Sequence, residues 1–345
     1  MKGFGKIGSL VLLSIPLLWW AIRDIPLAGI YATLLRLSPA ALLSLFLANA
    51  LILLLFAGRW WVVMRAVGYS LPILSLTIYR LAGFGVSYFT PGPQFGGEPL
   101  QVHLLHRHNR VPSTTALAGV TVDKLVELLA NFSFLVFGLI LVFNGRLFPA
   151  SGLLLVLSAG LLSLPVIYLF LLWLRRRPAS WLLMRIKLRS KWMAAFTHAR
   201  HQVISAEEQV SNFLFDQPRA LLGALAISSV TWILMIFEYW LTIRILGIHL
   251  EPAQVIVALT AARMAFLLPV PAGLGALEAG QVAAMQILGV EPVVGISVSF
   301  LIRARDITIG ALGLWLGGLS TRLQPYDPPA VAQTVPIPSE RRNTK

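Results

Sequence analysis

Two stretches of proline and glycine, about 180 residues apart within apolar sequence, constrain this chain more than any other feature. The first is segment 89–98, Phe-Thr-Pro-Gly-Pro-Gln-Phe-Gly-Gly-Glu, and the second is segment 268–278, Leu-Pro-Val-Pro-Ala-Gly-Leu-Gly-Ala-Leu-Glu. Because proline removes a backbone donor and glycine frees the backbone, we expect helices to break at both places. Irregular backbone inside a membrane is tolerated only where protein or a watery cavity covers it. Two ordinary loops between helices are the alternative.

The composition indicates an integral membrane protein. The 345 residues are 57% hydrophobic and 12% charged, with a mean hydropathy of +0.78, whereas soluble domains carry roughly 25% charged residues. The chain has no cysteine, which excludes disulfides, thiolate metal sites and cysteine nucleophiles. The net charge of +14 does not indicate nucleic-acid binding, because the basic residues lie between apolar runs, as in the cytoplasmic loops of membrane proteins.

The apolar runs predict an all-α, polytopic bundle with about six full spans, at about 20 residues per crossing. The runs are 7–22, 38–57, 114–143, 150–174, 218–246 and 292–320. Lys2 and Lys6 precede the first run, and no small-x-small cleavage site follows it, so we expect a retained span rather than a signal peptide. Segments 72–111 and 252–290 carry the two breaks, and each has the length of a helix, a break and a returning helix. We expect both to be re-entrant hairpins.

The two halves of the chain read as an inverted repeat. Each half has a span, a hairpin and a span, over residues 38–143 and 218–320. The offset between corresponding motifs drifts only from 178 to 183 residues. Many transporters have this architecture, with broken helices and a binding site near the bilayer midplane.

Charge predicts the orientation. Arg59 and Arg65 follow the span 38–57, and segment 103–110 and loop 175–217 are also basic. If the first hairpin dips in and returns, these residues share one side with both termini. The positive-inside rule makes that side the cytoplasm. We therefore expect a multi-pass protein of the bacterial cytoplasmic (inner) membrane with both termini cytoplasmic.

The basic loop 175–217 alternates Arg and Lys with aromatic and aliphatic residues. This pattern is typical of an amphipathic helix on the anionic inner leaflet, with an ordinary solvated loop as the alternative. Residues 323–345 are rich in proline and predict a disordered cytoplasmic tail. The transmembrane domain is therefore expected over residues 1–322. The pair Gly313-x-x-x-Gly317 predicts close helix packing within the monomer.

Several ionisable residues fall within the apolar segments, where each costs on the order of 3 kcal/mol. They are Arg80, Glu98, Asp123, Lys124, Glu127, Glu238, Arg263, Glu278, Arg303, Arg305 and Asp306. Asp123 and Glu127 are four residues apart and share a helix face, and we expect Arg305 and Asp306 to pair with the opposite half. Ion pairs that only fix helix packing are one interpretation. The other is a partly hydrated cavity that offers arginines to a phosphate, whose oxygens the planar guanidinium binds bidentately.

These residues and the two breaks define the predicted substrate-binding or translocation site. Its members are Arg80, Pro91, Pro93, Gly96, Gly97, Glu98, Asp123, Lys124, Glu127, Arg263, Pro269, Pro271, Gly273, Gly275, Glu278, Arg305 and Asp306. The histidines His103, His106 and His108 are expected to form an interfacial basic patch rather than a metal site, because no carboxylate or cysteine completes the set. No cofactor is predicted.

The two motifs resemble those of the lysylphosphatidylglycerol synthase transmembrane (flippase-like) family. The resemblance rests on Pro91-Gly-Pro-x-x-Gly-Gly-Glu98 with Asp123-Lys124, and on Pro269-x-Pro-x-Gly-x-Gly-x-x-Glu278 with Arg305-Asp306, and it covers about residues 5–322. It implies that the membrane region moves lipid between leaflets. In the synthases a separate cytosolic domain makes the aminoacylated lipid, and only a short tail follows the last span here, so lysyl transfer is not expected. Stand-alone relatives are implied to serve glycolipid, polyprenyl-phosphate or hopanoid pathways.

The leading hypothesis is a non-enzymatic translocase that moves an anionic, glycosylated or polyprenyl lipid between leaflets. The head group would pass the polar centre, and the carboxylates are candidates for proton coupling because no ATPase motif is visible. The expected partners are membrane lipids with phosphate-bearing head groups. A second hypothesis is a scaffold that docks a lipid-biosynthesis enzyme through loop 175–217. A third is an intramembrane enzyme acting on a lipid phosphate.

Overall fold

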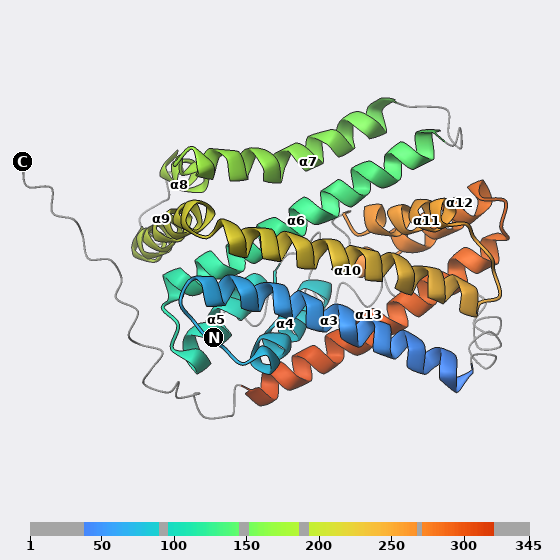
Figure 1. Ribbon diagram of the computed structural model, residues 1–345, viewed down its shortest axis with the longest axis horizontal. Helices are drawn as coiled ribbons and strands as arrows, with labels where there is room; N and C mark the ends of the chain where they lie inside the picture. The colour runs from blue at the N-terminus through green and yellow to red at the C-terminus, as the bar shows by residue number, and fades with distance from the viewer. Residues whose placement is uncertain (1–37, 90–95, 145–151, 186–192, 268–270, 321–345) are drawn as a thin grey trace, which may run out of the picture.

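The fold is all-α, as the sequence predicts. The computed structural model describes residues 38–89, 96–144, 152–185, 193–267 and 271–320. Across these ranges the chain forms eleven α-helices and one 3-10 turn, with no strand (Figure 1). The predicted span 7–22 and the predicted tail 323–345 lie outside the described residues.

Three helices are long and apolar enough to cross a membrane: α3 (Pro39–Ala66), α6 (Ser113–Asn144) and α10 (Pro218–Ile245). A helix of 28 residues, such as α3, is about 42 Å long, which exceeds the roughly 30 Å hydrocarbon core. Three predicted runs are thus confirmed as helices of spanning length. The runs 150–174 and 292–320 correspond to α7 (Gly152–Trp173) and α13 (Pro292–Ser320).

The outer surface of these helices is apolar. On α3, Leu43, Phe46 and Leu47 are 57%, 67% and 58% exposed, and on α10 Leu222 and Ile233 are 65% and 67% exposed. Large apolar side chains at such exposure suit contact with lipid. A bilayer therefore supplies the missing neighbours of this face.

Both predicted breaks separate two helices. The first lies between α4 (Ile73–Phe89) and α5 (Glu98–Asn109). The second lies between α11 (Pro252–Ala265) and α12 (Ala276–Ile287), with the 3-10 turn η2 (Pro271–Gly273) in between. The helix–break–helix prediction is confirmed at both places. That the hairpins turn back inside the bilayer stays a prediction.

Gly97 lets the first hairpin close tightly. A Cβ atom placed on Gly97 would lie 1.9 Å from the carbonyl oxygen of Gly83 on α4, so only glycine fits there. The Gly97 amide donates to the Ser87 hydroxyl at 2.9 Å. The chain thus returns along α4 directly after the break.

The order of elements is the same in both halves of the chain. A long helix, a shorter helix, a break, a 12-residue helix and a long helix occur as α3–α6 and again as α10–α13. The packing also corresponds, because α4 lies against α13 and α11 lies against α6, while α3 and α10 lie against each other.

Helices α3 and α10 run antiparallel through the middle of the bundle (Figure 1). Asn49 Nδ2 donates to Glu238 Oε1 at 3.2 Å, and Arg59 donates to the Ser228 hydroxyl at 3.2 Å. From the first bond to the second, the residue number increases on α3 and decreases on α10. These corresponding helices of the two halves therefore point in opposite directions.

Glycines bring α4 and α13 into backbone contact, which confirms the predicted packing role of Gly313 and Gly317. A Cβ on Gly313 would lie 2.0 Å from the Leu81 carbonyl oxygen, and one on Gly317 would lie 2.6 Å from the Ala82 Cβ. The contact is made within the monomer.

The basic segment 175–217 contains two helices, α8 (Pro178–Arg185) and α9 (Met193–Asp216). Helix α9 packs on α6, α7 and α8 and buries Ala206, Val210 and Phe213. Glu207 of α9 accepts hydrogen bonds from the Ala179 and Ser180 amides at 2.8 and 2.9 Å, which satisfies donors at the start of α8. This part of the chain is packed onto the bundle at one end of the molecule (Figure 1).

Candidate functional site

A cavity of about 240 Å³ lies inside the bundle, lined by α3, α4, α5, α6, α10, α11 and α13. Ten ionisable side chains line it: Arg59, Arg80, Glu98, Asp123, Lys124, Glu127, Glu238, Arg263, Arg305 and Asp306. Five are cationic and five are anionic, so their formal charges sum to zero. Phe56, Trp232 and Phe266 contribute aromatic wall. The cavity thus brings a balanced set of charges together inside an otherwise apolar bundle.

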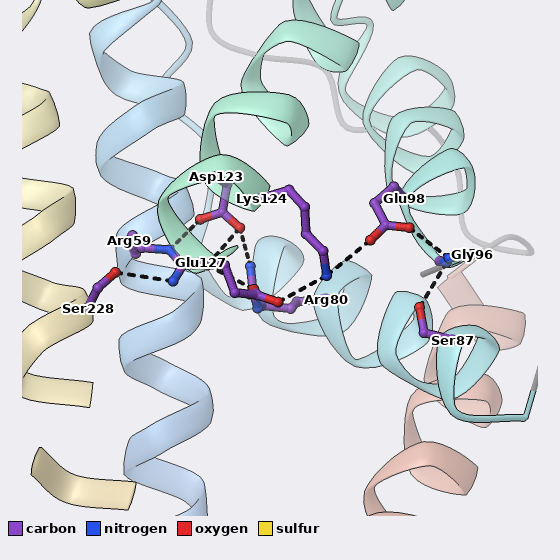
Figure 2. Close-up of polar contacts among 10 residues, drawn as sticks. Arg59, Arg80, Ser87, Gly96, Glu98, Asp123, Lys124, Glu127 and Ser228 are labelled. Atoms are coloured by element: carbon purple, nitrogen blue, oxygen red, sulfur yellow. Dashed lines mark hydrogen bonds and ion pairs between the residues drawn. The ribbon is translucent and has the colours of Figure 1, made fainter. Parts of the chain in front are cut away.

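Arg59 of α3 lies at the centre of the first ionic network, with its side chain 2% exposed. Its Nε donates to Asp123 Oδ1 at 2.7 Å, and a second nitrogen donates to Asp123 Oδ2 at 3.1 Å and to Glu127 at 3.0 Å. A bidentate contact of this kind is the strongest form of an arginine–carboxylate pair. The remaining guanidinium nitrogen donates a fourth bond to the Ser228 hydroxyl of α10 (Figure 2).

The prediction that Arg59 lies in a loop after the span 38–57 is wrong. Helix α3 continues to Ala66, and Arg59 is buried within it. Two carboxylates of α6 pair with the guanidinium and offset the free-energy cost of burying its charge. That cost was the reason to predict a loop.

Arg80 and Lys124 complete the first network. Arg80 of α4 donates to both Asp123 and Glu127, and its guanidinium also lies 4.8 Å from the Phe56 ring centroid. Lys124 lies 3.0 Å from Glu127 and 3.2 Å from Glu98. Three cations thus meet three carboxylates in a continuous chain across four helices, as Figure 2 shows.

A second, smaller network lies between α10 and α13. Both oxygens of Glu238 accept from Arg305 at 3.1 Å, and Asn49 of α3 donates to the same carboxylate. Arg305 also donates to its neighbour Asp306 at 2.9 Å. The expectation that Arg305 pairs with the opposite half is wrong, because its carboxylate partners Glu238 and Asp306 both belong to its own half.

Arg263 of α11 has a different environment. Its guanidinium lies 5.2 Å from the Trp232 ring centroid, and one nitrogen lies 3.9 Å from the Met235 sulfur. Among the described residues it makes no ion pair with a carboxylate. The charges that act on it come from Arg305, Asp306, Glu238 and Glu127.

The two hairpin glutamates have similar surroundings. Glu98 accepts from the Gly96 amide at 2.8 Å and pairs with Lys124 of the following long helix. Glu278 accepts from the Gly275 amide at 2.9 Å and pairs with Arg303 of the following long helix. Each glutamate thus fastens its break to the next long helix.

Arg303 also holds the second break through the backbone. It donates to the carbonyl oxygens of Ala272 and Gly273, at 3.1 Å in each case. Neither Arg303 nor Glu278 lines the cavity. In the second half, Glu278 therefore stabilises the break and does not form part of the cavity wall.

The structure brings eight of the predicted site residues together around the cavity. They are Arg80, Glu98, Asp123, Lys124, Glu127, Arg263, Arg305 and Asp306. The members Gly96, Gly97, Pro271, Gly273, Gly275 and Glu278 lie at the two breaks and do not line it. Pro91, Pro93 and Pro269 lie outside the described residues.

Sequence reasoning missed Arg59, Ser228 and Asn49 as site residues. Asn49 and Ser228 occupy matching places on α3 and α10, and Glu238 lies as far along α10 as Arg59 lies along α3. The predicted correspondence between the halves could therefore have found them, if its offset had been applied to the polar residues within the spans.

The three predicted patch histidines do not share one environment. His103 and His106 are exposed, whereas His108 is buried beside Tyr79, with ring centroids 6.2 Å apart. His106 Nδ1 lies 2.9 Å from the Val111 carbonyl oxygen. Within the described ranges no three histidine or carboxylate side chains are grouped as metal ligands would be.

Comparison with known proteins places these features in a family. Residues 7–313 match the family described as "Lysylphosphatidylglycerol synthase TM region". A "UPF0104 membrane protein" of Methanothermobacter thermautotrophicus is 23% identical over 299 residues, which cover 81% of this chain and 85% of that protein. A second protein of that name, from Methanocaldococcus jannaschii, is 23% identical over 103 residues, 30% of this chain and 31% of its own. No solved structure matches. The chain belongs to the family of the lysylphosphatidylglycerol synthase transmembrane region.

Proposed function

We propose that this protein moves a lipid with a phosphate-bearing head group between the leaflets of the cytoplasmic membrane. The observation that carries the proposal is the neutral, ion-lined cavity inside an apolar bundle. Buried ionisable residues are costly in a membrane and mark substrate pathways by default. A polar head group needs such an interior in order to cross the hydrocarbon core.

The size of the cavity supports a head group rather than a whole lipid. Its volume of about 240 Å³ is below the roughly 300–1,000 Å³ of pockets that enclose drug-sized ligands. The acyl chains would therefore remain in the bilayer while the head group occupies the cavity. The apolar exposed faces of α3 and α10 leave lipid next to the bundle.

The correspondence of the two halves supports alternating access. The antiparallel pair α3–α10 and the matched contacts α4–α13 and α11–α6 are what an inverted repeat would produce. In transporters built this way, one repeat moves against the other around a fixed central site. We propose that the cavity is that site, with α8, α9 and both termini on the cytoplasmic side.

The test is leaflet-specific quenching of head-group-labelled lipids in liposomes that contain the purified protein. We expect faster exchange with wild type than in empty liposomes. Leu128→Trp fills part of the cavity, and we expect it to abolish the acceleration. Leu47→Trp adds the same ring on the lipid-facing side of α3 and serves as the control. Equal rates for wild type and empty liposomes with anionic, zwitterionic and polyprenyl-phosphate lipids would overturn the proposal.

A scaffold for a lipid-biosynthesis enzyme is the second candidate, favoured by the exposed surface of α8. Trp181 and Leu182 are 52% and 57% exposed, and the Arg185 guanidinium lies 4.0 Å from the Trp181 ring centroid. Such a basic aromatic surface suits an anionic leaflet or a partner protein. If this is its role, Trp181→Ser impairs function in cells while Leu128→Trp does not.

A further inference from the structure

Two ionic groups of the cavity are incompletely bonded, and they have opposite sign. Arg263 contacts only an aromatic face and a thioether, with no carboxylate partner among the described residues. Asp306 accepts through Oδ1 from Arg305, while its Oδ2 accepts no hydrogen bond within the described part of the chain. The Asp306 side chain is only 9% exposed, so bulk water does not freely replace the missing partner. Both residues line the cavity.

In the first half of the chain, the residues that correspond to Arg263 and Asp306 are bonded to each other. Arg263 and Asp306 each lie 183 residues after a counterpart, Arg80 and Asp123 respectively. In the first half the arginine and the aspartate bond to each other. In the second half Arg305 takes one oxygen of Asp306, and Arg263 remains apart on the cavity wall. The arginine and the aspartate that bond each other in the first half are therefore not bonded to each other in the second, which leaves Arg263 and the second carboxylate oxygen of Asp306 able to bond a ligand.

The other cavity cations are already bonded to carboxylates, so they are less able than Arg263 to bind a phosphate. Arg59, Arg80 and Lys124 face three carboxylates, and Arg305 already bonds Glu238 and Asp306. A guanidinium binds phosphate oxygens bidentately and keeps its charge at any working pH. A phosphate would therefore find its partner at Arg263.

Charge balance then restricts the head group. The ten ionisable side chains of the cavity sum to zero, so a monoanionic head group would leave one negative charge unpaired in a poorly solvated interior. An uncompensated buried charge is strongly unfavourable. A zwitterion adds no net charge, and it offers an ammonium group to the open carboxylate oxygen.

Resting on the translocase function proposed above, we infer that Arg263 and Asp306 form the two ends of a subsite for a zwitterionic phospholipid head group. Arg263 binds the phosphate, and Asp306 accepts hydrogen bonds from a primary ammonium group. The Arg263 guanidinium lies over the indole of Trp232, and this cation–π contact helps to hold it in place.

The experiment is calorimetric titration of the purified full-length protein in detergent micelles with four probes. These are dihexanoyl phosphatidylethanolamine, dihexanoyl phosphatidylcholine, dihexanoyl phosphatidylglycerol and inorganic phosphate. We expect the ethanolamine lipid to bind most tightly, because the choline lipid lacks N–H donors and the glycerol lipid is a monoanion. Inorganic phosphate is expected to bind weakest.

Single substitutions then test which residue binds each end of the head group. We expect Arg263→Gln to weaken binding of the ethanolamine lipid at least about tenfold, as for loss of a hydrogen bond to a charged group, and Arg263→Lys to weaken it less. Asp306→Asn should remove the preference for the ethanolamine lipid over the choline lipid. Arg244→Gln is the matched control, because Arg244 lies 5.3 Å from the Trp240 ring centroid in the same kind of contact and does not line the cavity. Gel filtration of each variant checks that it remains folded.

The outcomes separate the two proposals. Unchanged affinity in Arg263→Gln, or equal or tighter binding of the glycerol lipid, overturns the subsite while lipid binding itself survives. Inorganic phosphate binding as tightly as the ethanolamine lipid would show a free-anion site and also overturns it. Absence of binding by all three lipids, together with no exchange in liposomes, overturns the translocase function as well.

Discussion

Lys124 of α6 forms an ion pair of 3.2 Å with Glu98 at the start of α5. The same carboxylate accepts from the Gly96 amide, so it connects the first break to the ionic network of the cavity (Figure 2). We expect Glu98→Gln to slow lipid exchange in liposomes, because a neutral amide no longer compensates Lys124. It should also lower the Tm, but by less than a fully buried member of the network would, since the Glu98 side chain is 23% exposed. Exchange at the wild-type rate would contradict a role for this pair.

Asp123→Asn should be far more damaging to the fold. The change leaves Arg59 and Arg80 with one carboxylate fewer in a buried site, and breaking a buried pair costs about 3–5 kcal/mol. The measurement is the Tm in detergent micelles. Glu208→Gln is the control, because Glu208 pairs with Arg177 at the surface, where both side chains are about half exposed. Equal Tm values for the two variants would refute the structural importance of the network.

Gly313→Ala tests the contact between α4 and α13. The added Cβ would lie 2.0 Å from the Leu81 carbonyl oxygen, so the two helices must separate. Gly318→Ala is matched to it, because a Cβ at Gly318 meets no atom within 4 Å. We expect a drop in Tm and loss of lipid exchange for the first variant and wild-type behaviour for the second.

The inverted orientation of the halves is open to thiol labelling, because the chain has no cysteine of its own. Ser70→Cys and His249→Cys place single thiols at exposed positions in the loops after α3 and α10. Since α3 and α10 are antiparallel, we expect a membrane-impermeant reagent to reach these two thiols from opposite sides, and the Ser70→Cys thiol from the cytoplasm. Labelling of both from one side would rule out the inverted repeat.

Hydropathy and helix breakers were sufficient to predict much of the fold. Long apolar runs predicted α3, α6 and α10, and the paired Pro and Gly motifs predicted where both hairpins break. These features are local, so a single sequence contains them. Asp123, Glu127 and Arg80 could also be recognised as site residues, because charge inside a span is rare.

Residue Arg59 shows why the rest could not be predicted. A charge near the end of an apolar run predicts the start of a loop. Arg59 is instead a buried helical residue because Asp123, 64 residues away, and Glu127 accept its hydrogen bonds. Arg303 and Arg305 show the same limit. Their positions two residues apart do not reveal that one supports the second break while the other lines the cavity. That division depends on the rotation of α13, which is set by its packing on α4 and α12.

The hydrogen bonds Asn49–Glu238 and Arg59–Ser228 lie ten residues apart on each helix, a separation of about 15 Å along the helix axis. They therefore join α3 and α10 at two separate points, both in the interior of the helices. In the alternating-access movement proposed above, parting the helices on the Asn49 side would break the first bond and keep the second, and parting them on the Arg59 side would do the reverse. The contact between α3 and α10 would then open toward one face of the bilayer while it stays bonded toward the other.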